Sequence, residues 1–532
     1  MNKKAFINGI IFTANDNQPY AEAVITEGKN ILFTGSNKEA DAIVDDYTEV
    51  FDLKKRLMLP GLIDNHTHFI YGGFYLKGLD LRPANSVGDF IYLLKSYIEK
   101  NSGKWVTGGN WNHESWDIKL LPTRKLIDNF STETPVFINR IDGHIGLANS
   151  LALKLAGISR DSDDPAGGII DKDSNGEPTG ILKDSAINLV TSVIPPPSEQ
   201  EYYAAALASL DEAKRFGITS IQDITLRNDF IAYQQLLKND ALSCRIYTRF
   251  PIQDYTNLVN SGIKYNFGND KLKIGSLKAF SDGSLGANTA WFFDPYNDSP
   301  DNYGLPMDIV SNGSLHRMAI DADRYKLQLS IHAIGDKANS YLLDLLEDIT
   351  DRNVAWDRRF RIEHAQHVRK PDLKRISNLK AIVSAQPFHL NDDGNWAEKK
   401  IGYNRVQESF SFKSMLNSGI KLCFGSDFPV VSLNPLLGIY SAVTRRTSDG
   451  KNYDGWVSNE KISVEDAVKC YTINNAYAAF EENIKGSIEP GKLADMVVLD
   501  ENILSVDHEK IKDANVIMTI LDGEIIYRNN NY

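Results

Sequence analysis

The chain has 532 residues, of which 42% are hydrophobic and 24% are charged, and its formal net charge is −12 at pH 7. This composition is that of a folded globular protein and excludes collagen, coiled coil and extended disorder. An acidic balance gives no general attraction to phosphate backbones or anionic lipid, so we expect no nucleic-acid partner. The three cysteines, Cys244, Cys423 and Cys470, are too few and too far apart for a disulfide framework, which is typical of a reducing compartment.

Targeting and membrane signals are not recognisable in the sequence. The first residues contain two lysines and a short apolar run that breaks at Asn8-Gly9, without a small-residue cleavage site after it. No stretch approaches the roughly 20 consecutive apolar residues that a membrane helix needs. We therefore expect a cytoplasmic protein that does not interact with a membrane.

Both ends of the chain predict short strands separated by turn residues. The N-terminal candidates are 5–10, 23–27, 30–34 and 49–52, and the C-terminal ones are 496–500, 516–521 and 524–527. Clusters of Asn, Asp and Gly between them are typical turn chemistry. Because both ends have this pattern of short strands and turns, we predict that they share one sheet.

Between these ends, short apolar strands alternate with amphipathic helical stretches, which favours parallel βα units. Ten candidate strands can be identified, two more than an eight-stranded barrel needs: 62–66, 105–109, 135–139, 218–223, 244–250, 274–280, 327–332, 360–364, 381–385 and 422–426.

The excess is explained if the second and third candidates belong to an insertion. Residues 100–200 contain far more turn-forming Gly, Pro and Asn-Gly than a barrel repeat normally has. A clear helix at 202–216, ended by Gly217, then leads into 218–223 as the second barrel strand. We predict an inserted flap at 101–199, a barrel from 58–100 and 200–484, and a β domain from 1–57 and 485–532.

Several predicted barrel strands end in a residue that can bind a metal or move a proton, at the end where barrel active sites are built. His66 and His68 are two apart on an extended backbone, so both rings point to the same side. Each candidate alone has an ordinary structural explanation, such as a core histidine or a helix cap. Their occurrence at the same end of strands one, four, five, six and eight predicts one metal site: His66, His68, Lys278, His332, His364 and Asp427.

This set of side chains suits a divalent metal and hydrolysis. Neutral imidazoles and carboxylates favour borderline ions such as zinc, and no cysteine is placed to close a structural site. A bound ion lowers the pKa of a coordinated water toward about 7. Asp427 is placed to accept the proton of that water and to pass it to a leaving group.

The chain resembles the amidohydrolase superfamily of metal-dependent hydrolases, specifically the amidohydrolase-3 branch, which includes enzymes like N-substituted formamide deformylase. The first matching stretch is PGLIDNHTH at 60–68. The others follow in order along the chain at 142–144, 149–150, 178–180, 217–220, 278, 282–286, 332–336, 363–366, 386–387, 425–427 and 490–495. The family often has Glu where this chain has Asp184, so a contact from that segment differs here.

The resemblance implies a distorted (β/α)8 TIM barrel with a small β-sandwich built from both chain ends and a flap inserted after strand one. It also implies that His66 and His68 bind one ion and that an N-carboxylated Lys278 bridges two ions. His332 and His364 would bind the second ion, and Asp427 would be both ligand and general base. An unmodified Lys278 that contacts substrate beside a single ion remains an alternative. Relatives are frequently dimers, which makes a homodimer an expectation.

Other polar residues are candidates for binding a small-molecule substrate. The predicted flap supplies Trp111, His113 and His144, and the segment after strand seven supplies Gln386 and Arg405. A guanidinium such as that of Arg405 is the usual partner of a carboxylate.

The leading hypothesis is a metal-dependent hydrolase of a non-peptide C–N bond in an amide, formamide, carbamate or N-acyl group. A mononuclear aminohydrolase that deaminates a heterocycle is an alternative, although such enzymes usually have Glu three residues after the strand-five histidine, where this chain has Gly335. A catalytically inactive binding relative is another, and the same ligands also allow hydrolysis of a phosphoester or lactone.

Overall fold

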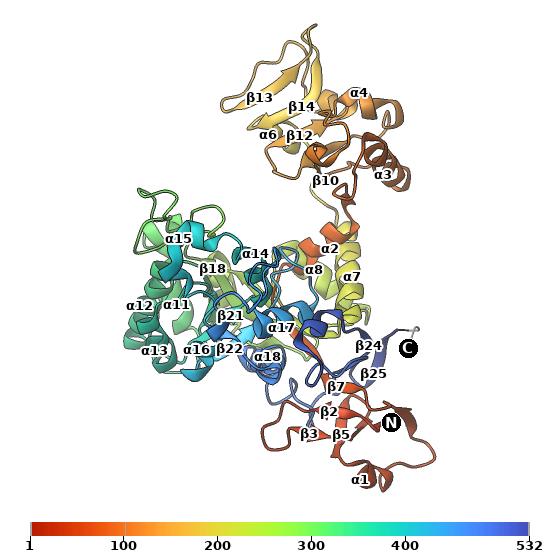
Figure 1. Cartoon of the computed structure of the whole chain (residues 1–532), viewed down its shortest axis with the longest axis vertical. Helices are drawn as coiled ribbons and strands as arrows, with labels where there is room; N and C mark the ends of the chain where they lie inside the picture. Colours follow the sequence, from red (N-terminus) through yellow and green to blue (C-terminus); the bar gives the residue numbers. More distant parts are fainter. Residues whose placement is uncertain (1–2, 102, 530–532) are drawn as a thin grey trace. The chain divides into compact units, whose positions relative to one another are not determined.

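A computed structural model describes residues 3–101 and 103–529, and its central element is a nearly closed sheet of eight parallel strands (Figure 1). In chain order these are β8 (Leu62–Thr67), β15 (Ile218–Ile224), β16 (Arg245–Pro251), β18 (Leu272–Phe280), β19 (Gln328–Ala333), β20 (Arg361–His364), β21 (Ile382–Ala385) and β22 (Lys421–Phe424). Each pairs with the next, and a short β17 (Phe267–Gly268) lies antiparallel beside β18. The eight predicted barrel strands are confirmed.

The barrel closes between its first and last strands just beyond their ends. A parallel bridge joins Thr67 to Phe428, and the Asp427 amide donates to the His66 carbonyl at 2.7 Å. The seam therefore lies at two of the candidate metal ligands.

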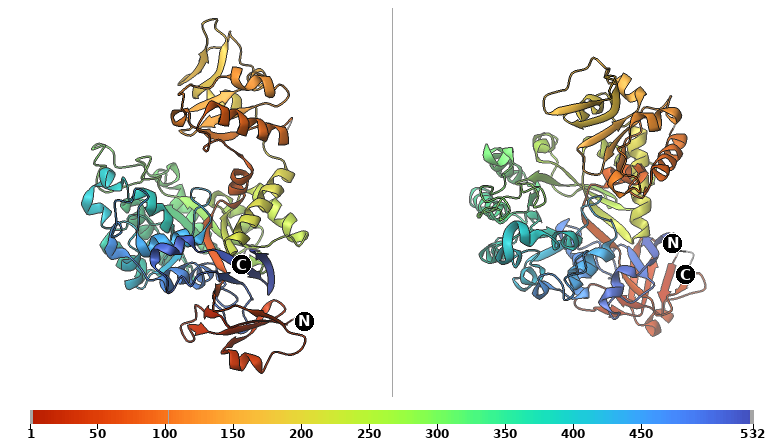
Figure 2. Two further views of the ribbon diagram at one scale, coloured as in Figure 1. Left: turned by 45° about the vertical axis from the view of Figure 1, so that its right-hand side comes forward. Right: turned by 45° about the horizontal axis from the view of Figure 1, so that its top comes forward.

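Helices surround this sheet (Figures 1 and 2). Helices α11 (Ser314–Arg324) and α12 (Asp336–Arg352) pack against β19, and α16 (Phe412–Asn417), α18 (Val464–Cys470) and α19 (Ile473–Ala478) pack against β22. In α12 the buried leucines Leu342, Leu345 and Leu346 recur at helical spacing, which places them on one face. The strands, covered by helices outside and filled inside, are buried along nearly their whole length, as parallel strands usually are.

The two ends of the chain form a sandwich of two sheets. One contains β1 (Lys3–Ile7), β4 (Ala23–Glu27), β5 (Asn30–Gly35) and β6 (Glu49–Asp52). The other joins β2 (Ile10–Phe12), β3 (Tyr20–Ala21) and β7 (Leu57–Pro60) to β23 (Met496–Leu499), β24 (Val516–Leu521) and β25 (Glu524–Arg528). Their facing side chains share one core that includes Phe6, Val24, Met58, Val498 and Ile520. The prediction that both ends contribute to one sheet is confirmed.

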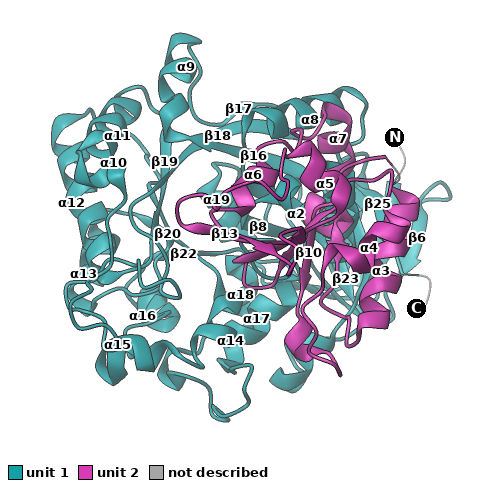
Figure 3. Ribbon diagram, turned by 90° about the horizontal axis from the view of Figure 1, so that it is seen from above, with its two compact units in different colours: residues 1–72, 206–532 teal, residues 73–205 magenta. Residues whose placement is uncertain are grey.

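Residues 73–205 form a second compact unit, distinct from the first unit made of the preceding and following segments (Figure 3). Its sheet has the order β13 (Gly168–Lys172), β14 (Pro178–Asp184), β12 (Ile145–Ala148), β11 (Phe137–Arg140), β10 (Gly108–Trp111) and β9 (Leu79–Asp80). The predicted flap at 101–199 lies within this unit, which also includes α3 (Val87–Lys100). Its two ends are adjacent, since the rings of Phe74 and Tyr202 pack edge to face with centroids 5.2 Å apart.

None of the helices in residues 3–101 and 103–529 combines the length and apolar character that a membrane crossing requires.

A buried ion pair joins the sandwich to the barrel. Arg245, the first residue of β16 and only 1% exposed, donates to both carboxylate oxygens of Asp495, at 2.7 and 2.8 Å. Its guanidinium also contacts the carboxylate of Asp522 at the turn before β25. These bonds connect the barrel to the loops that flank β23 and β25.

Replacing Asp495 by alanine is expected to lower the free energy of unfolding by about 3–5 kcal/mol, because Arg245 would be left buried with an incomplete set of partners. Guanidinium unfolding followed by circular dichroism measures this. Lys104→Ala, which removes an exposed pair with Glu201 at 3.4 Å, should change it by less than about 1 kcal/mol. Equal effects of the two substitutions would contradict a special contribution of the Arg245–Asp495 pair to stability.

Candidate metal centre

Three of the six predicted ligands meet closely at the carboxyl ends of the barrel strands. One ligand atom each from His66, His364 and Asp427 lies within 4.8 Å of the others, and all three side chains are buried. Asp427 Oδ1 is 3.5 Å from His66 Nε2 and 3.3 Å from His68 Nε2. These distances leave room for an ion between the groups.

The other predicted ligands surround this group. The ring of His332 lies 4.4 Å from that of His364, centroid to centroid, and its Nε2 is 3.1 Å from the Gly283 carbonyl oxygen. Lys278 is buried on β18, two residues before Phe280, whose ring centroid is 4.8 Å from Lys278 Nζ. His68 is the most open member, with a side chain that is 34% exposed. The topology therefore brings all six to one end of the barrel.

The orientation of His66 is fixed from behind by Glu363. Glu363 Oε2 lies 2.5 Å from His66 Nδ1, and its other oxygen contacts Arg249 Nη1 at 2.9 Å and Arg361 Nε at 3.0 Å. A carboxylate can only accept at Nδ1, so the imidazole carries its proton there and presents Nε2 to the site. This carboxylate–histidine arrangement is usual behind metal-binding histidines.

The electrostatics leave the imidazoles neutral and the carboxylates charged. Burial lowers the pKa of His66 to about 3 and holds the pKa of His364 well below its ordinary value. Burial alone would raise the pKa of Glu363, but Arg249 and Arg361 outweigh it and hold that pKa well below the usual range. For Asp427, too, the neighbouring His66 and His68 outweigh burial and lower the pKa. These are the protonation states in which histidine and aspartate bind metals.

His364 is held by its own partner and by an unusual backbone. Gln386 Oε1 lies 2.7 Å from His364 Nδ1, so this nitrogen donates and Nε2 is free to bind. Ordinary strand alternation would turn Glu363 and His364 to opposite faces. His364 instead has a φ of 71°, and the His66 ring contacts both residues. Asp427 is also left-handed, with a φ of 61°, and such strained residues cluster at functional sites.

Further carboxylates hold the loops that carry the ligands. Asp64 accepts from the amides of His66 and Ser426, and so ties β8 to the segment after β22. Asp223, at the end of β15, accepts from the Phe69 amide at 2.7 Å, next to His68. Asp282 accepts from the amides of Ile334, Gly335 and Trp291, and so fixes the loop after His332.

Two of the six predicted ligands have a buried polar atom that lacks a hydrogen-bond partner among the residues that the structure describes. These atoms are Lys278 Nζ and Asp427 Oδ1. Burial lowers the pKa of Lys278 to about 7. Buried polar groups are rarely left unpaired, so these two atoms mark a place built to receive another group.

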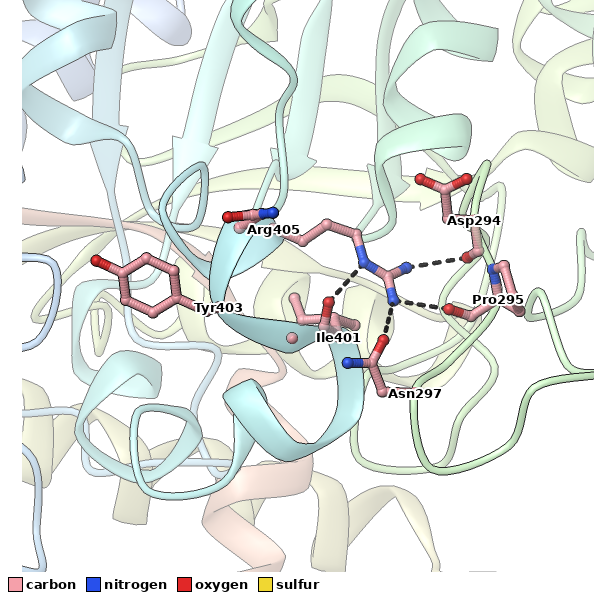
Figure 4. Close-up of a pocket in the computed structure, with 8 residues that line it drawn as sticks. Asp294, Pro295, Asn297, Ile401, Tyr403 and Arg405 are labelled. Carbon is pink, nitrogen blue, oxygen red and sulfur yellow. Dashed lines mark hydrogen bonds between the residues drawn. The ribbon is translucent and has the colours of Figure 1, made fainter.

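Gln386 and Arg405 have partners other than the predicted substrate. Gln386 orients His364, as described above. Arg405 donates to the carbonyls of Ile401, Asp294 and Pro295 and to the side chain of Asn297, beside a surface pocket of about 490 Å³ (Figure 4). Because its guanidinium is bound to backbone carbonyls, Arg405 joins its own helix, α15 (Ala397–Val406), to the loop at 294–297.

The remaining predicted substrate contacts belong to the second unit. Trp111 is fully buried in that unit's core and donates through Nε1 to the Ile138 carbonyl at 3.2 Å. His113 lies near Trp111, with ring centroids 5.8 Å apart. His144 is exposed, and its Nδ1 is 2.9 Å from Asp184 Oδ1. Their role in substrate binding stays a prediction.

Sequence reasoning missed the buried network behind the ligands. Arg249, Arg361 and Glu363 carry charge within strands that are otherwise apolar, and Arg361 and Glu363 are two residues apart on one strand face. Charged residues at alternate positions of a buried strand are a recognisable signal of a paired interior network.

A barrel with histidines and an aspartate gathered at its mouth is the architecture of a metal-dependent hydrolase. The crystal structure of an uncharacterized metal-dependent hydrolase from Pyrococcus horikoshii is similar over 96% of this chain and 99% of that chain, with a TM-score of 0.79 and 28% identity. The model of the amidohydrolase family (Amidohydro_3) matches residues 49–527. The chain belongs to the amidohydrolase family and is a metal-dependent hydrolase by that membership, as the sequence resemblance predicts.

Two relatives match over nearly the whole chain. Protein LONG AFTER FAR-RED 3 of Arabidopsis thaliana is 37% identical over 98% of this chain and 91% of its own length. N-substituted formamide deformylase of Arthrobacter pascens is 25% identical over 98% of this chain and 97% of its own length.

Glu363→Gln is expected to weaken metal binding by about 10- to 100-fold, because an amide is a poorer acceptor for His66 and leaves the two arginines without their counter-charge. Competition with a chelator measures the affinity. Glu482→Gln, which alters the pair with Arg359, is the matched control. Unchanged affinity in Glu363→Gln would show that Glu363 does not support the metal ligand.

Proposed function

We propose that this protein hydrolyses a non-peptide C–N bond in an amide, formamide, carbamate or N-acyl group of a small molecule, with Asp427 as the general base. The observation that carries the proposal is the convergence of neutral His66 and His364 with the charged Asp427 at the barrel mouth. The formamide deformylase relative acts on a bond of this kind by its name and supports the choice of bond.

The donor set fits a divalent ion. The residues that would hold one or two ions are His66, His68, Lys278, His332, His364 and Asp427. Nitrogen and oxygen donors without thiolate suit a borderline divalent ion, of which zinc is our choice. A bound ion of this kind polarises the scissile carbonyl and makes water nucleophilic near neutral pH.

Lys278 is the ligand that needs a chemical explanation. A buried cation without a partner would repel a second cation in the same site, whereas N-carboxylation would turn it into an anionic ligand. The position of Nζ, buried and unpaired among the described side chains, supports this modification. An unmodified Lys278 would instead favour a single ion and a contact with substrate.

The protein's own residues move the proton and hold the geometry. Asp427 takes a proton from the attacking water and later gives it to the leaving nitrogen, so that an amine can depart. Glu363 and Gln386 fix the tautomers of His66 and His364 through their Nδ1 atoms. The burial of these groups excludes bulk water and strengthens each interaction.

Asp427→Asn is expected to lower kcat by about 10²- to 10⁴-fold, because an amide cannot accept the proton. Initial rates with a panel of N-substituted formamides, acetamides and carbamates measure the effect, with metal content determined on the same samples. The exposed Asp454→Asn should leave the rate unchanged. A variant at position 427 that turns over normally would remove Asp427 from the mechanism.

Metal per chain, measured by elemental analysis on protein purified without chelator, tests the role of Lys278. Two equivalents in the parent that fall to one or fewer in Lys278→Ala would support a lysine-bridged pair. The exposed Lys451→Ala should retain the parent's content. One equivalent that is insensitive to Lys278→Ala would favour the mononuclear alternative, and no metal after reconstitution would favour an inactive relative.

A further inference from the structure

Phe280 is an aromatic residue at the barrel mouth that none of the roles above uses. It is the last residue of β18, and 39% of it is exposed, whereas residues 274–279 of the same strand are buried. A single exposed apolar side chain is ordinary on a protein surface and needs no explanation by itself. Its significance depends on what lies beside it.

The ring of Phe280 lies beside two of the predicted metal ligands. Lys278 is two residues earlier in the strand and therefore on the same face, and its Nζ is 4.8 Å from the centroid of the ring. On the neighbouring strand β19, His332 pairs with Phe280 in the register of the sheet, and the two ring centroids are 5.4 Å apart. The partly exposed ring therefore borders the space around these ligands.

The polar and apolar side chains at nearby strand ends differ in their surroundings. Asp223, near the end of β15, accepts from one backbone amide and from threonine and tyrosine hydroxyls, and Asp282, just after β18, accepts from three backbone amides. Leu226 follows β15 and is 57% exposed, and Val430 follows β22 and is 66% exposed. These carboxylates are thus engaged within the protein, whereas the apolar side chains are open to a ligand.

We propose that Phe280 is a specificity-determining residue, whose ring forms one wall of a subsite for an apolar substituent of the substrate. This inference rests on the proposed function. A substituent that covers the exposed part of the ring removes apolar surface from water on both sides of the contact, which favours binding in proportion to the area. The substituent belongs either to the acyl group or to the nitrogen of the scissile bond, because both offer the same apolar chemistry.

Two matched series of substrates test the subsite and distinguish these two positions. One lengthens the acyl group of an N-methylamide from acetyl to hexanoyl, and the other lengthens the nitrogen substituent of a formamide from methyl to pentyl. We expect kcat/KM of the parent to rise at least about tenfold with chain length in one series, because each fully buried methylene strengthens binding about fourfold and the ring covers one side of the chain.

Phe280→Ala is expected to lose most of this preference and to change kcat/KM of the short members by less than about threefold, with metal content at the parent's value. Phe280→Leu, which keeps a smaller apolar wall, should show an intermediate preference. The control is Phe267→Ala, since Phe267 is also exposed but lies on β17, where it pairs with Ile274. A purely structural role would lower the rates of short and long substrates equally.

A binding measurement separates this inference from the proposed function, because it needs no turnover. Calorimetric titration of the zinc-loaded protein compares acetohydroxamate with hexanohydroxamate, and N-methyl- with N-pentyl-N-hydroxyformamide. We expect the parent to bind the longer member of one pair about tenfold more tightly, and Phe280→Ala to bind both members of that pair with affinities within about threefold of each other.

A parent that hydrolyses none of the substrates, but whose preference for the longer hydroxamate depends on Phe280, would refute the proposed function and retain the subsite. The same chain-length preference in parent and Phe280→Ala would overturn the inference. So would a parent without preference in either pair, or a variant that loses metal together with its affinity for short and long compounds alike.

Discussion

The charge of Glu363 at the centre of the barrel is the interaction on which the site depends. Full burial would normally neutralise a carboxylate, and Arg249 and Arg361 prevent this by contacting one of its oxygens while His66 contacts the other. The same arginines bind the neighbouring strands, since Arg361 donates to the Asn65 carbonyl and Arg249 to the Gln222 carbonyl. The buried charge of Glu363 therefore fixes both the tautomer of His66 and the relative positions of several strands.

Such a network serves the site more than the stability of the fold. Buried ion pairs seldom stabilise a protein more than apolar residues of similar size would, but removal of one partner is costly. The polar interior of this barrel and the left-handed backbone at His364 and Asp427 both lower the stability of the fold. Both fix the positions of the ligands. The nearby Lys278 follows the same principle, since its buried Nζ has no hydrogen-bond partner in the described structure.

The barrel could be predicted from sequence because buried parallel strands are short apolar runs with clear boundaries. The expected strand 327–332 differs from β19 (Gln328–Ala333) by one residue at each end. The candidate ligands followed from topology, which puts the ends of parallel strands at one mouth. The sequence pattern of an amphipathic helix does not show which sheet the helix covers. The sequence of α3, in the second unit, is therefore like that of a barrel helix. Nor does it give the partners of Gln386 and Arg405, which come from segments that only the fold brings near.

The adjacent ends of the second unit bear on how the barrel assembles. Strands β8 and β15 pair directly, yet about 150 residues separate them in the chain, and closing such a loop costs about 1.4 kcal/mol more than closing one of about 30 residues. Folding of residues 73–205 brings Phe74 against Tyr202 and reduces that long loop to a short connection. Loop-closure entropy therefore favours an order of folding in which residues 73–205 form before β8 pairs with β15.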